Sequence, residues 1–166
     1  MLAEKYADRI AKIFAKYPDR RSGVMALLYL AQEEYGWVTP EAIKEVAELC
    51  DIDPTQVQSI AGFYTMYSEK PKGKYWLQVC TDLPCALRGA DEFYRQLCEY
   101  LGLDEEGGTT EDGLFTVEPV ICLAACDRAP MLQCNFHYHE NLDMEKIKAL
   151  IEQWRAEASR SDGDRG

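Results

Sequence analysis

The sequence has few basic residues, only two histidines and no long hydrophobic run, and these shortages exclude several classes of function. Its 166 residues include 18 Lys or Arg against 29 Asp or Glu, which gives a net charge of −11. Nucleic acid and anionic membrane surfaces are bound by surplus Lys and Arg, so we expect neither as a partner. An acidic surface is also typical of ordinary solubility and does not by itself identify a partner.

No segment is suited to crossing or entering a membrane. The longest apolar run, Val24 to Ala31, is too short to span a bilayer. The first residues carry charges throughout, whereas a signal peptide has a basic start followed by an apolar stretch. We therefore expect a cytoplasmic protein without direct membrane insertion, held at a membrane only through a partner.

Familiar catalytic and nucleotide-binding motifs are missing as well. There is no G-x-G-x-x-G and no P-loop, and the pair Gly107-Gly108 stands in an acidic stretch. No Ser/His/Asp set or pair of carboxylates stands out, so we expect no catalytic residue in this chain. His137 and His139 lie two apart on one face of a predicted strand, where packing in a hairpin is a commoner role than metal binding.

What remains is the composition of a folded protein, 47% hydrophobic and 28% charged, with helical periodicity in its first part. Apolar spacing predicts a helix over Ala3–Ala15. Ser22 is placed to cap a second helix that ends near Tyr35-Gly36. Thr39-Pro40 and Asp53-Pro54 are start signals for two more helices, with Gln56 placed to complete a capping box at the last.

The pattern changes after residue 70, near a short predicted linker. Strands, helices and a loop are then expected in the following order: strand Lys74–Val79, helix Leu87–Leu101, loop Asp104–Gly113, strand Leu114–Ile121, a hairpin around Asn135, helix Met144–Ala156 and a polar end from Glu157. Together these elements predict an α+β chain. It would consist of an N-terminal helical bundle at 1–70, a β-α-β-β-α domain at 71–160 and a polar tail at 161–166.

Four of the seven cysteines form two closely spaced pairs. Four residues separate Cys80 from Cys85 and three separate Cys122 from Cys126, and each pair is expected to lie in the loop just beyond a predicted strand. In a reducing compartment clustered cysteines suggest a metal or catalytic site, and two loops at strand ends can converge on one point. Soft thiolates hold iron well, and four cysteines are the usual ligand set of a [2Fe–2S] cluster.

Other interpretations of the four cysteines stay open at this point. Structural zinc also takes four cysteines, although its ligand pairs are most often two residues apart. A thioredoxin-type dithiol would need C-x-x-C, and two disulfides would need an oxidising compartment. The remaining cysteines, Cys50, Cys98 and Cys134, are expected to be small core residues.

Two arginines follow the cysteine pairs at short distance. Arg88 and Arg128 each lie a few residues beyond a cysteine and could offset part of the negative charge of a bound cluster, or simply solvate a surface. Backbone N–H groups of Thr81 to Leu83, in the loop that Pro84 restricts, are placed to donate hydrogen bonds to sulfur, which would help set a reduction potential.

The two cysteine segments resemble a known family. Val79 to Ala90 (V-C-T-D-L-P-C-A-L-R-G-A) and Val117 to Pro130 (V-E-P-V-I-C-L-A-A-C-D-R-A-P) are similar to the thioredoxin-like [2Fe–2S] subunit of NADH–quinone oxidoreductase, which is the E subunit of bacterial respiratory complex I. The segments 33–38 and 57–67 resemble the family's helical N-terminal region, so the resemblance extends from about Phe14 to Leu150.

The resemblance implies a fold, a cofactor and a partner. It implies a thioredoxin-like [2Fe–2S] ferredoxin domain behind a small helical bundle. The ligands of one cluster would fall on the positions Cys80, Cys85, Cys122 and Cys126. The implied partner is the flavoprotein subunit that carries FMN and the NADH site, and the implied role is single-electron exchange with that FMN in an NADH dehydrogenase. The exposed aromatics Trp37, Tyr64 and Tyr67 are candidate contacts, although core packing is commoner.

One position departs from the family pattern, and two other assignments compete. The family usually has glycine where this chain has Ala124. A loop that needed a positive φ there would place a steric penalty on alanine, but we expect instead that the methyl alters packing or hydrogen bonding beside the cluster. The same module occurs in NAD-linked hydrogenases and formate dehydrogenases, and a zinc-stabilised interaction module is a further alternative.

Overall fold

The structure is a computed structural model that describes residues 1–163, and its chain divides into two compact units, Met1–Pro71 and Lys72–Gly166. Each unit has its own hydrophobic core, so each is described separately.

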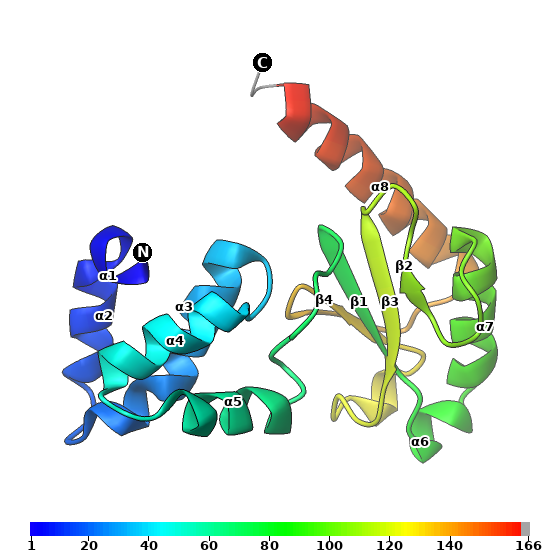
Figure 1. Cartoon of the computed structure of the whole chain (residues 1–166). Coiled ribbons are helices and arrows are strands. Elements are labelled where there is room, and N and C mark those ends of the chain that lie inside the picture. Colours follow the sequence, from blue (N-terminus) through cyan, green and yellow to red (C-terminus); the bar gives the residue numbers. More distant parts are fainter. Residues whose placement is uncertain (164–166) are drawn as a thin grey trace. The chain divides into compact units, whose positions relative to one another are not determined.

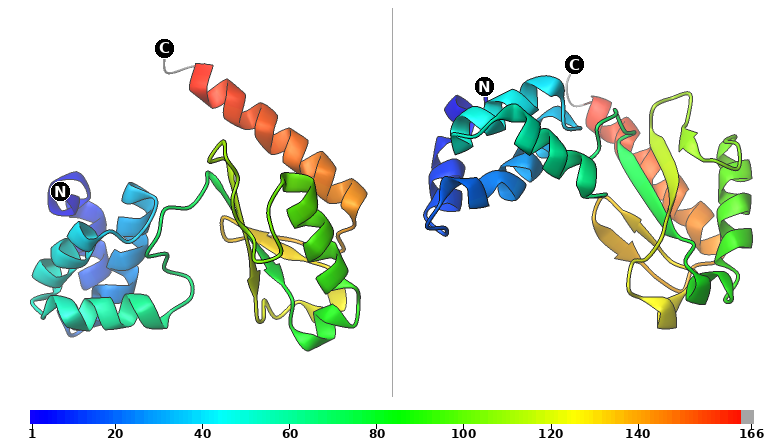
Figure 2. Two further views of the ribbon diagram at one scale, coloured as in Figure 1. Left: turned by 45° about the vertical axis from the view of Figure 1, so that its right-hand side comes forward. Right: turned by 60° about the horizontal axis from the view of Figure 1, so that its bottom comes forward.

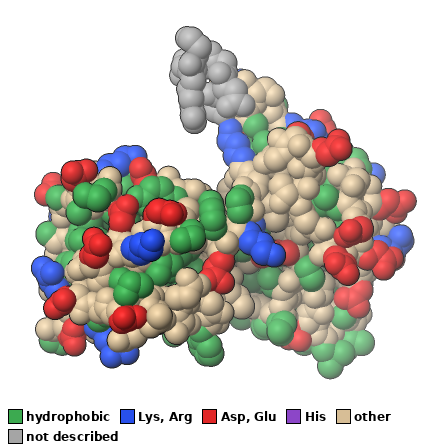
Figure 3. All heavy atoms as spheres, viewed as in Figure 1, with side chains coloured by type: hydrophobic (Ala, Val, Ile, Leu, Met, Phe, Trp, Pro, Cys, Tyr) green, Lys and Arg blue, Asp and Glu red, His purple; other side chains and the backbone are tan. Residues whose placement is uncertain are grey.

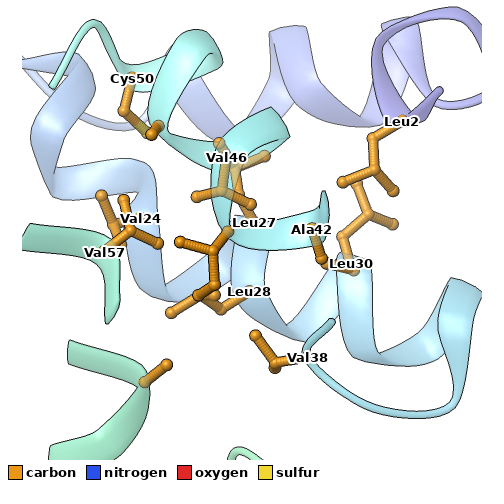
Figure 4. Packing of buried hydrophobic residues seen from close by; sticks show 14 of the residues in the cluster. Leu2, Val24, Leu27, Leu28, Leu30, Val38, Ala42, Val46, Cys50 and Val57 are labelled. Carbon is orange, nitrogen blue, oxygen red and sulfur yellow. The ribbon is translucent and has the colours of Figure 1, made fainter. Parts of the chain in front are cut away.

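The first unit is entirely helical (Figure 1). Its elements are α1 (Leu2–Lys5), α2 (Ala7–Phe14), the 3₁₀ turn η1 (Arg20–Gly23), α3 (Val24–Tyr35), α4 (Pro40–Cys50) and α5 (Pro54–Phe63). Their apolar faces meet in a core to which α3, α4 and α5 contribute fully buried side chains, including Leu27, Val46 and Val57 (Figure 4). The helices are therefore held mainly by packing of their inner faces.

Local signals set several helix ends in this unit. The Thr39 hydroxyl accepts a hydrogen bond of 3.0 Å from the Ala42 N–H at the start of α4. The Asp53 carboxylate accepts one of 2.8 Å from the Thr55 N–H at the start of α5. Gly36 ends α3 with φ of +78°, a backbone conformation that glycine adopts without steric penalty.

Two predictions for this unit were wrong. The single helix expected over Ala3–Ala15 is interrupted at Tyr6, whose φ of −123° leaves the helical range and whose hydroxyl donates to Glu34 at 2.5 Å. Ser22 does not cap α3, because it lies inside η1, and the side chain that accepts the capping bond there belongs to Asp19. At Tyr6 a contact with another part of the chain outweighs the helical periodicity. At Ser22 a competing cap close by takes the place of the expected one.

The second unit is a mixed sheet with helices (Figure 1). Its elements are β1 (Tyr75–Cys80), α6 (Leu83–Ala86), α7 (Ala90–Leu101), β2 (Gly108–Thr109), β3 (Phe115–Val120), η2 (Cys126–Arg128), β4 (Leu132–Cys134), β5 (His137–His139) and α8 (Met144–Gly163). The sheet order is β2-β3-β1-β4-β5, with β1 and β3 parallel and the other pairs antiparallel.

Both long helices of this unit cover one face of the sheet (Figure 2). Tyr75, Leu77 and Val79 of β1 point to that face and pack with side chains of α7 and α8. The opposite face of β1 is also buried, but it carries polar groups. Gln78 accepts a hydrogen bond of 2.9 Å from Gln133, and the Trp76 indole donates to Glu118 at 2.7 Å, so these buried groups are paired.

Several boundaries of helices and loops in this unit differ from the predicted ones. The expected loop Asp104–Gly113 contains β2, where the Val117 carbonyl of β3 approaches Gly107 so closely that a side chain would collide with it. The helix expected from Leu87 begins at Ala90, after Gly89 with φ of +90°.

The polar end predicted from Glu157 is helical as far as Gly163, because α8 continues its buried stripe to Ala158. Residues 164–166 of the predicted tail lie outside the described residues. Within residues 1–163, no helix combines the length and the apolar character needed to cross a membrane.

Candidate metal centre

The two cysteine pairs begin at the carboxyl ends of neighbouring parallel strands. Cys80 is the last residue of β1 and lies opposite Val120, the last residue of β3. Cys122 follows two residues later. Adjacent strands lie about 4.8 Å apart, so this register brings the first cysteine of each pair to the same edge of the sheet.

The Cys85 thiol interacts with two of the other three cysteines. Cys85 lies in α6, just after β1, and interacts with Cys80 and Cys126. Burial, followed by the hydrogen bond with Cys80, raises the pKa of the Cys85 thiol to about 12. Metal binding requires thiolates, so loading this site would release such protons.

Cys122 is more exposed than the other three cysteines of the two pairs. Its side chain is exposed, and its sulfur accepts a hydrogen bond of 3.4 Å from the Ala124 N–H. Among residues 1–163, no three His, Cys, Asp or Glu side chains are gathered as ligands of one metal ion. The expectation that all four cysteines lie in loops was wrong in part, because Cys80 ends a strand, Cys85 is helical and Cys126 opens η2.

Ala124, between the cysteines of the second pair, has φ of +56°. From the sequence we expected altered packing and not backbone strain at this position, and that expectation was wrong about the backbone. A left-handed alanine costs about 1–2 kcal/mol because its Cβ approaches the following carbonyl oxygen.

The two arginines have different surroundings. Arg88 donates from Nε to the Ala129 carbonyl at 3.2 Å, which ties the segment after Cys85 to the segment after Cys126. Arg128 forms an ion pair of 2.7 Å with Glu140 and a longer one with Asp127. The charge of Arg128 is thus matched locally, and Arg88 is the better placed of the two to face a negative group.

The other residues considered from the sequence lie away from this centre or inside a core. Cys50, Cys98 and Cys134 are buried, and burial raises the pKa of each thiol. His139 packs edge-on against Trp154, with 5.3 Å between ring centroids. Of the three aromatics proposed as partner contacts, Tyr67 is buried, Trp37 is half-buried and Tyr64 is exposed.

Sequence reasoning missed Tyr138. Its hydroxyl donates a hydrogen bond of 2.7 Å to the carbonyl of Leu123, inside the second cysteine loop. The signal was absent because the contact depends on how the β4–β5 hairpin is placed against the loop.

A thioredoxin-like sheet with four cysteines at one edge defines a class, the thioredoxin-like ferredoxins with cysteine-bound iron and sulfide. Residues 10–155 match the family described as thioredoxin-like [2Fe-2S] ferredoxin, and the chain belongs to this family. The cofactor is accordingly a [2Fe–2S] cluster.

Within this family, the chain is similar to curated subunits of NADH-quinone oxidoreductase. NADH-quinone oxidoreductase subunit 2 of Thermus thermophilus is 44% identical over 152 residues, which are 90% of this chain and 83% of the relative. The second E-type subunit of NADH-quinone oxidoreductase from Rhizobium meliloti is 39% identical over 149 residues, 90% of this chain and 88% of the relative. The predicted resemblance to the E-type subunits is thereby confirmed.

A solved structure shares the fold. An NAD⁺-reducing [NiFe]-hydrogenase in its H₂-reduced state aligns with a TM-score of 0.71 at 24% identity, over 81% of this chain. The chain spans only 22% of that hydrogenase chain, so the likeness concerns the fold alone.

The residues present fit a [2Fe–2S] cluster in their chemistry. Four thiols come from two segments at one sheet edge, and two of them, Cys80 and Cys85, are buried beside the apolar side chains of Leu123 and Met131. A diiron cluster is bound by four thiolates, and donors to its sulfurs tune it. The Ala124 N–H is such a donor.

Proposed function

We propose that this chain is an electron-transfer subunit of NADH–quinone oxidoreductase, with one [2Fe–2S] cluster held by Cys80, Cys85, Cys122 and Cys126. The observation that carries the proposal is the register of β1 and β3, which starts both cysteine pairs at one edge of the sheet. The NADH-quinone oxidoreductase relatives, matched over 90% of this chain, support the choice of complex.

The cluster supplies the capacity to take up and release a single electron. The chain's own residues have simpler tasks. The four thiolates bind iron, Leu123 and Met131 keep water from the buried side, and the Ala124 N–H donates to sulfur. Electrons from NADH would reach this chain through the FMN of a partner flavoprotein, because a flavin can pass on hydride electrons one at a time.

Exposed apolar side chains surround the cysteines and suit that partner. Leu83, Leu87 and Ile121 are 69%, 80% and 81% exposed, and each lies within two residues of a proposed ligand. Figure 3 shows hydrophobic side chains gathered at the end of the second unit where α6 lies. Exposed apolar residues grouped at one place are typical of a protein interface. Association with a membrane would then come through the assembled complex.

The decisive measurement is spectroscopy of the anaerobically purified protein. We expect about two iron and two sulfide per chain, visible charge-transfer absorption and, after reduction, a rhombic spin-half EPR signal of about one spin per chain. A colourless protein with one zinc would instead support the zinc-stabilised interaction module and overturn the proposal.

The ligand assignment has its own matched test. Cys122→Ser should strongly disturb absorption and EPR, whereas Cys98→Ser, at a buried position of α7, should leave both close to the parent. Equal effects of the two substitutions would contradict the assignment.

A second complex is kept as an alternative because the hydrogenase shares the fold. An equivalent subunit of an NAD-linked hydrogenase or formate dehydrogenase would carry the same cluster. The native complex, purified through this chain, distinguishes them: NADH oxidation with a quinone supports our proposal, and hydrogen or formate oxidation with NAD⁺ supports the alternative.

A further inference from the structure

One peptide group in the second cysteine loop is hydrogen-bonded at both ends. Its carbonyl oxygen, from Leu123, accepts a bond of 2.7 Å from the Tyr138 hydroxyl. Its N–H, from Ala124, donates to the Cys122 sulfur at 3.4 Å. A trans peptide group is planar, and its carbonyl and N–H point in opposite directions. A bond that holds the Leu123 carbonyl therefore also fixes the direction of the Ala124 N–H.

The orientation of this peptide group is opposed by local backbone energy. Ala124 has φ of +56°, which is unfavourable for alanine. Rotating the Leu123–Ala124 peptide group by about half a turn would carry this φ into the negative range that alanine prefers. The same rotation would turn the N–H away from the Cys122 sulfur. Some contact must hold the strained orientation, and the Tyr138 bond acts directly on the group that would rotate.

Tyr138 is well placed to hold the Leu123–Ala124 peptide group in this orientation, and its side chain contributes little else to the packing. It lies in β5 opposite Gln133 of β4, and β4 pairs with β1, the strand that ends in Cys80. Tyr138 therefore lies in the same sheet as the strand that leads into the first cysteine pair. The side chain is 48% exposed, so its ring contributes little to a core.

We propose that Tyr138 is a positioning residue that aims the Ala124 amide at the sulfur of Cys122 and thereby raises the reduction potential of the cluster. The inference rests on the proposed ligand role of Cys122. A donor to a ligand sulfur stabilises the additional negative charge of the reduced state, which is why hydrogen bonds to sulfur help to set such potentials.

Tyr138→Phe tests this in the loaded full-length protein, because it removes only the hydroxyl. We expect a more negative midpoint potential, a changed EPR line shape, and amide hydrogen exchange about 3- to 10-fold faster in the peptide covering residues 121–127, the loss expected for one hydrogen bond. Tyr100→Phe is the matched control. Tyr100 is 40% exposed, and its hydroxyl donates to Glu152 at 3.3 Å, a bond that joins α7 to α8 and involves no cysteine loop.

A rescue separates positioning from general destabilisation. Adding Ala124→Gly to Tyr138→Phe removes the backbone preference for rotation, so part of the lost potential should return. A potential and loop exchange in Tyr138→Phe that equal those of Tyr100→Phe would overturn the inference and leave the proposed function standing. Purified protein without iron would overturn the proposed function, whereas exchange in the loop would still report on the Tyr138 bond.

Discussion

Ala124 shows how a single residue can be strained beside a functional site. Glycine at this position would avoid the left-handed penalty of about 1–2 kcal/mol, but it would cost about 0.4–1 kcal/mol through the greater freedom of the unfolded chain. We therefore expect Ala124→Gly to stabilise the second unit by about 0.5–1 kcal/mol. Urea unfolding of parent and variant at equal iron content measures the difference.

The neighbouring alanine provides the control. Ala125 is buried and has a negative φ of −128°, so it does not carry the left-handed penalty. Ala125→Gly should destabilise the unit by about 1–2 kcal/mol, from chain entropy and one lost buried methyl group. If the two substitutions changed stability in the same direction, the strain at Ala124 would not be the controlling effect.

At the scale of single elements, the start of α5 should depend on pH. Hydrogen bonds from Thr55 lower the pKa of Asp53, so the unfolded chain binds this proton more readily than the folded one. Its contribution to stability is present above the ordinary carboxyl pKa of about 3.9 and is lost as the pH falls through the lowered folded value. Asp53→Asn keeps an acceptor oxygen but removes the titration.

Unfolding of parent and Asp53→Asn across the acid range tests the assignment. We expect the parent to be more stable at neutral pH and the difference to shrink as Asp53 becomes protonated. Thr39→Ala, at the cap of α4, serves as a control, because it should cost about 1 kcal/mol at every pH. A difference for Asp53→Asn that stays constant with pH would contradict the assignment.

Elements whose ends carry a local signal could be predicted from the sequence. Thr39, Asp53 and Gly36 act within a few residues of their own positions, so the ends of α3, α4 and α5 followed from residue type. By contrast, β2 has only two residues and exists because β3 lies beside it. The last turns of α8 have a polar composition, and packing of Ala158 in the core extends the helix there. Neither depends on local propensity alone.

The same distinction applies to the site. Spacing was sufficient to propose the four cysteines as ligands, because each pair is local and follows a strand. The φ of Ala124 and the bond from Tyr138 to Leu123 depend on where a hairpin fifteen residues away is placed, which no local pattern specifies. The orientation of the loop amides is therefore the part of the site that could not be predicted from the sequence.

At the scale of the whole molecule, two separate cores limit what the cluster can stabilise. The core of the first unit is built from residues between Leu2 and Tyr67, whereas two of the proposed ligands, Cys80 and Cys85, belong to the apolar cluster that contains Leu123 and Met131. A ligand stabilises the structure that binds it and leaves independently folded parts unchanged. Each unit buries its own apolar residues, so we expect their responses to iron to differ.

Removal of iron should therefore loosen one unit selectively. After anaerobic chelation, amide hydrogen exchange should accelerate at the end of β1, in α6, across residues 121–125 and in η2, because these segments lose their common anchor. Amides of α3 and α4 should keep their protection, and they serve as the internal control within the same sample. Equal acceleration in α3 and α4 would show that the cluster supports the fold of both units, and it would contradict the assignment of the cluster's stabilising effect to the second unit alone.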